Sequence, residues 1–208
     1  MTKYIQLGLD YGTSAAKMIF RDFQATGGER SYVIDDFGGS FRVPTMVVYD
    51  ETRGEFLFGR KNASGIGSPL VYHSVKMRLA EEIKKDGKKY FYGMQIQFPD
   101  GVRARDIAIS TVWYLAVAAR TRILQFYGVG SDDLKMSMTM GIPMSFYNDA
   151  MLKEGFLEIV RSAYWLLKHQ DDCIIRDGCL SLENLRRLSE LARNKVQEVP
   201  APDTNTIR

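Results

Sequence analysis

The chain has 208 residues, 45% of them hydrophobic and 12% aromatic, which is enough for one full core with or without a smaller appended module. Its 28 basic and 25 acidic residues leave a net charge of +3, so the composition does not indicate a nucleic-acid-binding or membrane-surface protein. The first ten residues lack the apolar core of a signal peptide, and no uninterrupted apolar run approaches the ~20 residues of a membrane span. We therefore expect a soluble, cytoplasmic protein without nucleic-acid or membrane partners.

Cysteine usage agrees with this expectation. The chain has two cysteines, Cys173 and Cys179, which are too few for a disulfide framework and lack the His/Cys pairing of a zinc site. We expect both to be reduced, partly buried thiols.

The first sixty residues favour short antiparallel strands. Alternating apolar residues separated by glycine-rich or polar turns predict strands over 4–9, 16–20, 31–34, 45–49 and 55–58. The following stretch, 61–70, contains several Gly and Pro residues and is not expected to form a long regular element.

Helical patterns dominate the rest of the chain. A short helix is predicted over 75–84, a strand over 90–98, and the longest helix over 103–127. This last helix is apolar around much of its circumference and is therefore expected to be buried between layers.

The second half of the chain continues with a strand over 134–142, which ends at Pro143. Asn148 or Asp149 can cap a helix that runs to about His169, and Ser181 can cap a last amphipathic helix. Strands followed by a strand that alternates with helices indicate a mixed α/β sheet flanked by helices.

The run LGLDYGTSAAKMIF, residues 7–20, is the strongest functional signal. A buried strand ends in Asp10, and a turn of Gly12, Thr13 and Ser14 leads into a second apolar strand. The tip of such a hairpin offers backbone N–H groups and two hydroxyls to an anion, and Gly12 leaves room for a phosphate. A carboxylate beside it can hold Mg²⁺ through water. The motif differs from a P-loop, which opens into a helix, and taken alone it could also be an ordinary β-turn.

Four further segments follow this hairpin in the chain, and their order and spacing match those of a known family. With them, the chain resembles the 70-kDa heat-shock chaperones (DnaK type) of the actin-like ATPase superfamily over about residues 4–150. The segments that carry the resemblance are LGLDYGTS (7–14), VPTMVVYDETRGEFLFG (43–59), HSVKMR (73–78), the stretch 98–127 and TMGIPMSFYNDA (139–150).

The resemblance implies a fold and a domain organisation. The fold would be the first lobe of the actin-like ATPase fold, with a ribonuclease-H-like mixed five-stranded sheet flanked by helices. Its core would comprise 1–42 and 102–170, with 43–101 as an inserted α+β subdomain. An extra helical segment, 171–197, has no counterpart in the family, and 198–208 is expected to be a disordered tail or truncated linker.

The resemblance also implies ATP or ADP with Mg²⁺ as cofactors. Asp10 would position the hydrated magnesium, while Gly12, Thr13 and Ser14 would hold the β- and γ-phosphates. Lys76 falls on the chaperone lysine that reaches the γ-phosphate and orients the attacking water, a role that suits a mobile ammonium. Without the resemblance, Lys76 would be interpreted as a solvated surface lysine.

Lys17 departs from the chaperone pattern. It lies seven residues after Asp10, where actin and the sugar kinases of the superfamily place a phosphate-contacting lysine. From its place in the strand after the turn, Lys17 can face phosphate or solvent, so the division of work between Lys17 and Lys76 stays open.

No second Asp-Gly phosphate hairpin and no Gly-Gly adenosine motif follow Ser14 in the sequence. We therefore expect a first lobe with little or no ATP hydrolysis of its own and with the missing second lobe as its partner. The resemblance further implies peptide clients or co-chaperones. The alternatives are a lobe of a sugar kinase, a lobe of an actin-like filament or scaffold protein, and a binding module without catalysis.

Overall fold

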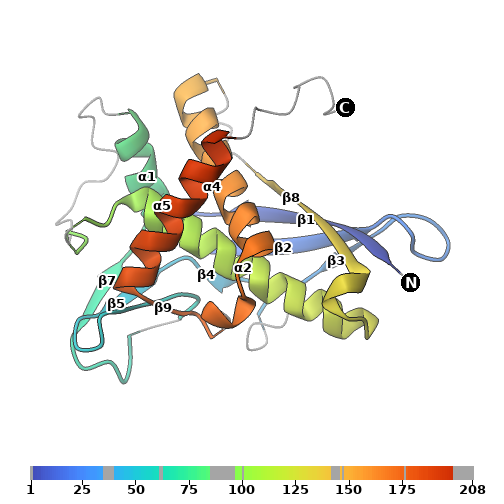
Figure 1. The fold of residues 1–208 in the computed structure, drawn as a ribbon, viewed down its shortest axis with the longest axis horizontal. Helices are drawn as coiled ribbons and strands as arrows, with labels where there is room; N and C mark the ends of the chain where they lie inside the picture. Colours follow the sequence, from blue (N-terminus) through green and yellow to red (C-terminus); the bar gives the residue numbers. More distant parts are fainter. Residues whose placement is uncertain are drawn as a thin grey trace.

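A computed structural model describes residues 2–34, 40–60, 63–84, 97–99, 101–141, 146, 148–175 and 177–198. Two β-sheets lie toward opposite ends of a long helix, α2, which passes through the middle of the molecule (Figure 1). The predicted strand over 90–98 lies outside these residues except at its end, as do Pro143 and the tail from 199 onward.

The larger sheet has five strands and is mixed. Strand β1 pairs antiparallel with β2 and parallel with β8, which gives the order β3-β2-β1-β8, and β4 pairs with the start of β2. The strands of this sheet are β1 (Lys3–Tyr11), β2 (Ala15–Asp22), β3 (Arg30–Val33), β4 (Val43–Pro44) and β8 (Leu134–Met140).

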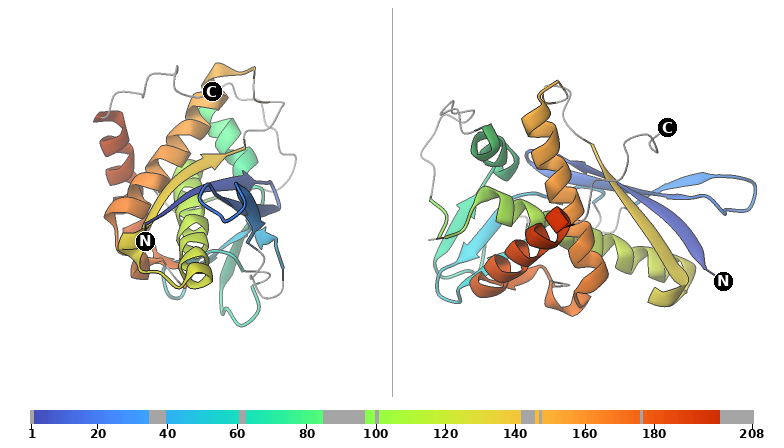
Figure 2. Two further views of the ribbon diagram at one scale, coloured as in Figure 1. Left: turned by 90° about the vertical axis from the view of Figure 1, so that its right-hand side faces the viewer. Right: turned by 45° about the horizontal axis from the view of Figure 1, so that its top comes forward.

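Side-chain alternation divides this sheet into two different faces. In β1, Leu7 and Leu9 are buried and face the helices, whereas Tyr4 and Asp10 are exposed on the opposite face. Strand β2 repeats the pattern, with Met18 buried. The left view of Figure 2 shows the strands in front and the helices α2 and α4 behind them. The predicted mixed α/β sheet with flanking helices is confirmed.

The smaller sheet has the order β7-β5-β6-β9, with every pair antiparallel. Three of its strands come from the predicted insertion: β5 (Val47–Asp50), β6 (Glu55–Leu57) and β7 (Pro69–Tyr72). The fourth, β9 (Cys179–Ser181), comes from the segment 171–197. Part of that segment therefore completes the sheet of the insertion, which the sequence did not indicate.

Helix α2 (Ala104–Tyr127) is the predicted long helix, and it is buried on most of its surface, with Ile109, Val112 and Trp113 fully enclosed. It is long and apolar enough to cross a membrane by length and composition alone. Since 67% of its most apolar stretch is buried against the rest of the protein, it is consistent with the core helix of a soluble protein.

Three other helices pack around α2: α1 (Val75–Lys84), α4 (Ala150–His169) and α5 (Leu182–Glu198). Two predicted caps are confirmed. Asp149 accepts a hydrogen bond from Leu152 N at 3.1 Å at the start of α4, and Ser181 Oγ accepts one from Asn184 N at 3.2 Å at the start of α5. The thiols differ from expectation in one respect, because Cys173 is exposed while Cys179 is half-buried.

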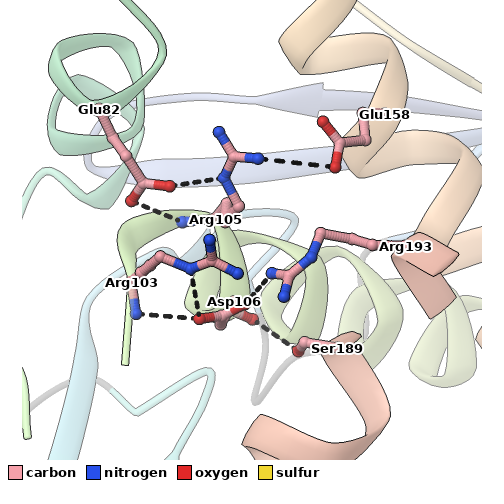
Figure 3. Close-up of polar contacts among 7 residues, drawn as sticks. All are labelled: Glu82, Arg103, Arg105, Asp106, Glu158, Ser189 and Arg193. Carbon is pink, nitrogen blue, oxygen red and sulfur yellow. Dashed lines mark hydrogen bonds and ion pairs between the residues drawn. The ribbon is translucent and has the colours of Figure 1, made fainter. Parts of the chain in front are cut away.

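A polar network at the start of α2 joins all four helices (Figure 3). Its centre is Asp106, which is buried, accepts a hydrogen bond from Arg103 N at 2.9 Å and forms an ion pair with Arg193 of α5. The neighbouring Arg105 lies 2.5 Å from Glu82 of α1 and 3.7 Å from Glu158 of α4. Arg103 Nε also lies 3.6 Å from Asp106, whereas buried Arg193 pairs with Asp106, so removal of Asp106 would leave Arg193 without this carboxylate partner.

The other end of α2 carries a second polar contact. Tyr127 Oη donates a 2.5 Å hydrogen bond to Asp22, the last residue of β2, and Lys3 Nζ lies 3.6 Å from the same carboxylate. Burial alone would raise the pKa of Asp22, but the hydrogen bonds from Tyr127 and Gln24 N and the charge of Lys3 outweigh it, so the pKa lies below its ordinary value of 3.8.

We expect Asp22→Asn to lower the free energy of unfolding at pH 7 by about 1–2 kcal/mol, because a charge-assisted hydrogen bond and an ion pair are lost. A depressed carboxyl pKa stabilises the fold above the unfolded-state value, and this contribution disappears as pH falls through the folded-state pKa. The difference between wild type and variant should therefore shrink below pH 3.8 in urea unfolding measured at several pH values.

Asp132→Asn is the matched control, because Asp132 is exposed and its loss should change stability by less than about 0.5 kcal/mol. A difference for Asp22→Asn that stayed constant from pH 7 to pH 3 would contradict the assignment of the charge to this contact.

Candidate phosphate-binding hairpin

The hairpin between β1 and β2 is closed by a tight turn over residues 12–14. Asp10 pairs with Lys17 and Tyr11 with Ala16, so the strands stay in register up to the turn. A Cβ added to Gly12 would lie 2.3 Å from the carbonyl oxygen of Ala15, far inside van der Waals contact. Glycine is therefore required here by the close approach of the two strands.

Thr45, directly after β4, braces this turn from outside. Its hydroxyl lies 3.0 Å from the carbonyl oxygen of Thr13 and 3.3 Å from that of Gly12, and its N–H donates to Ser14 O at 3.2 Å. Thr45 is 1% exposed, so these bonds are shielded from water. The insertion thereby fixes the turn through its carbonyl oxygens.

The N–H groups of the turn have no acceptor among the described residues. Thr13 and Ser14 are exposed, and no hydrogen bond between described residues uses either of their N–H groups as donor. Consecutive N–H groups at a turn form a concavity that binds anions. With the carbonyl oxygens held by Thr45, the tip can present N–H groups and hydroxyls to a ligand.

Lys76 reaches the neck of the hairpin from α1. It is buried, and its Nζ donates a 2.5 Å hydrogen bond to the carbonyl oxygen of Tyr11, next to Asp10. Burial lowers the pKa of Lys76 below its ordinary value of 10.5, and the nearby charge of Asp10 partly offsets this effect. Lys76 is therefore not the solvated surface lysine that the sequence alone would suggest.

Tyr11 anchors the neck to the core. Its side chain is 1% exposed, and burial raises the pKa of its phenol, with the nearby Thr111 of α2 acting in the opposite direction. One residue thus connects α2, through its side chain, and α1, through its carbonyl oxygen, to the end of β1.

Lys17 lies on the other strand, directly opposite Asp10. Directly paired residues of antiparallel strands project from the same face of a sheet, so Lys17 and Asp10 share the exposed face. Both are exposed, in contrast to Lys76. The hairpin thus combines one buried cation, one exposed cation and one exposed carboxylate.

The residues present fit a hydrated magnesium ion that is also bound by phosphate. Asp10 supplies a single accessible carboxylate, and the described residues contain no cluster of three or more His, Cys, Asp or Glu that could hold a metal by themselves. Mg²⁺ in nucleotide sites is commonly held by one or two carboxylates, water and the phosphates of the substrate. Asp10 is the residue that would hold it here.

All six residues predicted for the site, Asp10, Gly12, Thr13, Ser14, Lys17 and Lys76, are brought together at this hairpin. Sequence reasoning missed Thr45. A signal was present, since Thr45 is a polar residue beside the apolar run Met46–Val47–Val48, and a buried hydroxyl needs a hydrogen-bond partner. The identity of that partner could not be read from the sequence.

Comparisons with known proteins add no family assignment. No protein-family model matches the chain, and no curated protein matches it. The residues of the hairpin are therefore the basis for inferring a function.

We expect Thr45→Val to lower the free energy of unfolding by about 1 kcal/mol, because the turn carbonyls lose a buried donor while the shape of the side chain is kept. Amide hydrogen exchange at residue 45, whose N–H donates to Ser14 O, should become faster, since the brace acts locally. Urea unfolding and exchange measured by NMR would test both effects.

Thr121→Val is the control, because Thr121 also donates to a main-chain carbonyl oxygen, that of Val117 at 3.0 Å, but within α2. It should leave exchange at residue 45 unchanged. Equal exchange rates at residue 45 in wild type and Thr45→Val would show that the Thr45 hydroxyl does not brace the turn.

Proposed function

We propose that this chain is the phosphate-binding lobe of an ATPase of the actin and heat-shock-chaperone type. Its hairpin would hold the β- and γ-phosphates of Mg-ATP. The observation that carries the proposal is the arrangement at one turn of exposed Thr13 and Ser14, whose N–H groups have no acceptor among the described residues, a glycine that leaves no room for a side chain, and two lysines beside Asp10.

The topology supports the proposal. Three antiparallel strands followed, after a long helix, by a strand parallel to the first agree with a ribonuclease-H-like core up to its fourth strand. The fifth strand, β4, pairs with β2 beside the hairpin and does not extend the sheet beyond β8. The insertion after β3 supplies both Thr45 and Lys76, which gives it a direct part in building the site.

The residues of the hairpin would have different roles in binding the phosphates of Mg-ATP. The N–H groups of Thr13 and Ser14 bind and orient phosphate oxygens. Lys76, held by Tyr11 O, supplies a positive charge at a fixed place, whereas the exposed Lys17 supplies one that can adjust to the ligand. Asp10 would hold Mg²⁺ through water, and the bound ion would neutralise phosphate charge.

A second candidate is a lobe of a sugar kinase of the same superfamily. Lys17 favours it, because its place opposite Asp10 puts an exposed ammonium on the same face as the carboxylate. The insertion argues against it, since a lysine from α1 at the neck belongs to the chaperone pattern. An actin-like filament or scaffold protein would use the same hairpin, and nucleotide-dependent light scattering would reveal its assembly.

We further propose that the adenosine contacts come from a second lobe, which would close over the hairpin. One lobe alone cannot exclude water from the phosphates, so hydrolysis by this chain should be weak or absent. The proposed setting is the cytoplasm, with peptide clients or co-chaperones as further partners if the full protein acts as a chaperone.

The test is an NMR titration of the ¹⁵N-labelled chain with Mg-ATP and with Mg-tripolyphosphate. Both ligands should shift the amides of Thr13 and Ser14 and bind with similar, weak affinity, because this lobe grips phosphate alone. Lys17→Met and Lys76→Met should each weaken binding about tenfold, corresponding to one charge-assisted contact. A colorimetric phosphate assay should detect no more than marginal turnover.

Lys135→Met is the control, because Lys135 is exposed on the same sheet but lies opposite Tyr4, near the start of β1. It should leave both affinities unchanged. Unshifted amides at Thr13 and Ser14 would refute the phosphate site. Tight, micromolar binding of Mg-ATP with turnover would instead refute the half-site.

A further inference from the structure

A polar cavity of about 320 Å³ lies on the small sheet, and none of its lining residues belongs to the hairpin. Its floor is the outer face of this sheet, where Leu57 of β6 pairs directly with Cys179 of β9. Residues 64–66 of the loop between β6 and β7 form its wall. A cavity of this size is at the lower limit for binding a small organic molecule.

The lining of the cavity has two arginines, Arg53 and Arg60, and one carboxylate, Asp50. Its one carboxylate, Asp50, is buried and already satisfied, since it accepts hydrogen bonds from Thr52 N at 3.0 Å and Arg53 N at 3.3 Å and lies 3.8 Å from Arg53 Nε. Arg60 forms no ion pair or hydrogen bond with any described residue. Among the described residues that line the cavity, Arg60 therefore has no carboxylate partner.

The backbone next to Arg60 is closely packed at Gly59. Tyr114 of α2 inserts between Gly59 and Gly178, where an added Cβ would lie 2.6 Å from the Tyr114 hydroxyl in one case and 2.8 Å from Phe58 O in the other. Burial raises the pKa of Tyr114, and the charge of Arg60 acts in the opposite direction, which agrees with a guanidinium held nearby. Arg60 is thus presented by a constrained segment.

We propose that this cavity binds a small phosphate monoester. The oxyanion would lie between Arg60 and Arg53, because guanidinium groups bind phosphate through paired N–H donors. The organic part would contact Leu57 and Ile66, the apolar residues of the lining. This site is separate from the hairpin and does not depend on the function proposed for it.

The thiol in the floor provides a direct test. The chain has two cysteines, and trypsin separates them by cleaving after Arg176, so mass spectrometry can follow each alkylation rate. Cys173 is exposed and lies between Asp172 and Ile174, next to acidic residues, whereas Cys179 lines the cavity with two arginines. Each reagent forms a thioether bond at the sulfur and releases iodide.

We expect anionic iodoacetate, relative to neutral iodoacetamide, to be favoured at Cys179 over Cys173 by about fivefold at low ionic strength, the effect of one nearby charge. Arg60→Gln should reduce this preference, since the remainder would come from Arg53 and from the acidic neighbours of Cys173. Arg30→Gln, which removes an exposed arginine on β3 of the other sheet, should leave it unchanged. Equal preferences at the two thiols would overturn the anion site.

Phenyl phosphate then tests the class of ligand. At millimolar concentration it should slow alkylation of Cys179 by iodoacetamide, leave Cys173 unaffected, and lose its effect in Arg60→Gln. Inorganic phosphate should protect less, since it cannot contact Leu57 and Ile66. Equal protection by the two would overturn the monoester assignment, and no protection by either would overturn the site.

Discussion

The structure depends on the burial of one helix. Helix α2 is apolar on nearly every side, so it is stable in water only if other elements cover most of its surface, and the two sheets together with α1, α4 and α5 do so. Its polar ends then determine where these elements attach. At its start, Asp106 and Arg105 bind the other three helices, and at its end Tyr127 binds Asp22 of β2. Because both sheets contact the same helix, neither can loosen without exposing it.

The hairpin inherits its geometry from this arrangement. Tyr11 is buried against α2, α1 packs on α2 and extends Lys76 to Tyr11 O, and Thr45 begins the insertion that leads to α1. Three segments distant in sequence therefore hold the hairpin by its neck and by its carbonyl oxygens. Under the proposed function, this support would hold the N–H groups of Thr13 and Ser14 in place for a phosphate before it binds.

The sequence predicted those parts that follow local rules. The long helices, the caps Asp149 and Ser181 and the strands of the hairpin follow from periodicity and capping chemistry within a short stretch. The strands β4, β7 and β9 were not predicted, because each has two to four residues and exists through its partner strand, not through its own pattern. The role of Thr45 was also missed, because its partners lie 32 and 33 residues away in the chain. The hydrogen bond from Lys76 to Tyr11 O joins residues 65 apart and could not be predicted from the sequence either.

Lys76 and Lys17 differ in burial, and this difference would give them different roles in binding phosphate. Lys76 pays a desolvation cost that lowers its pKa, and within the described residues Asp10 is the charge that offsets it. An incoming phosphate would offset it further, so under the proposed function the ammonium is stabilised most when the ligand is bound. Lys17 has no such cost, because it is exposed and already solvated. A fixed cation therefore makes binding sensitive to where the phosphate sits, whereas an exposed one adds attraction with less demand on geometry. Under the proposed function, Lys76 at the neck of the hairpin, where α1 and β1 meet, would select the position of the phosphate. Lys17 on β2 would provide the initial attraction for the anion.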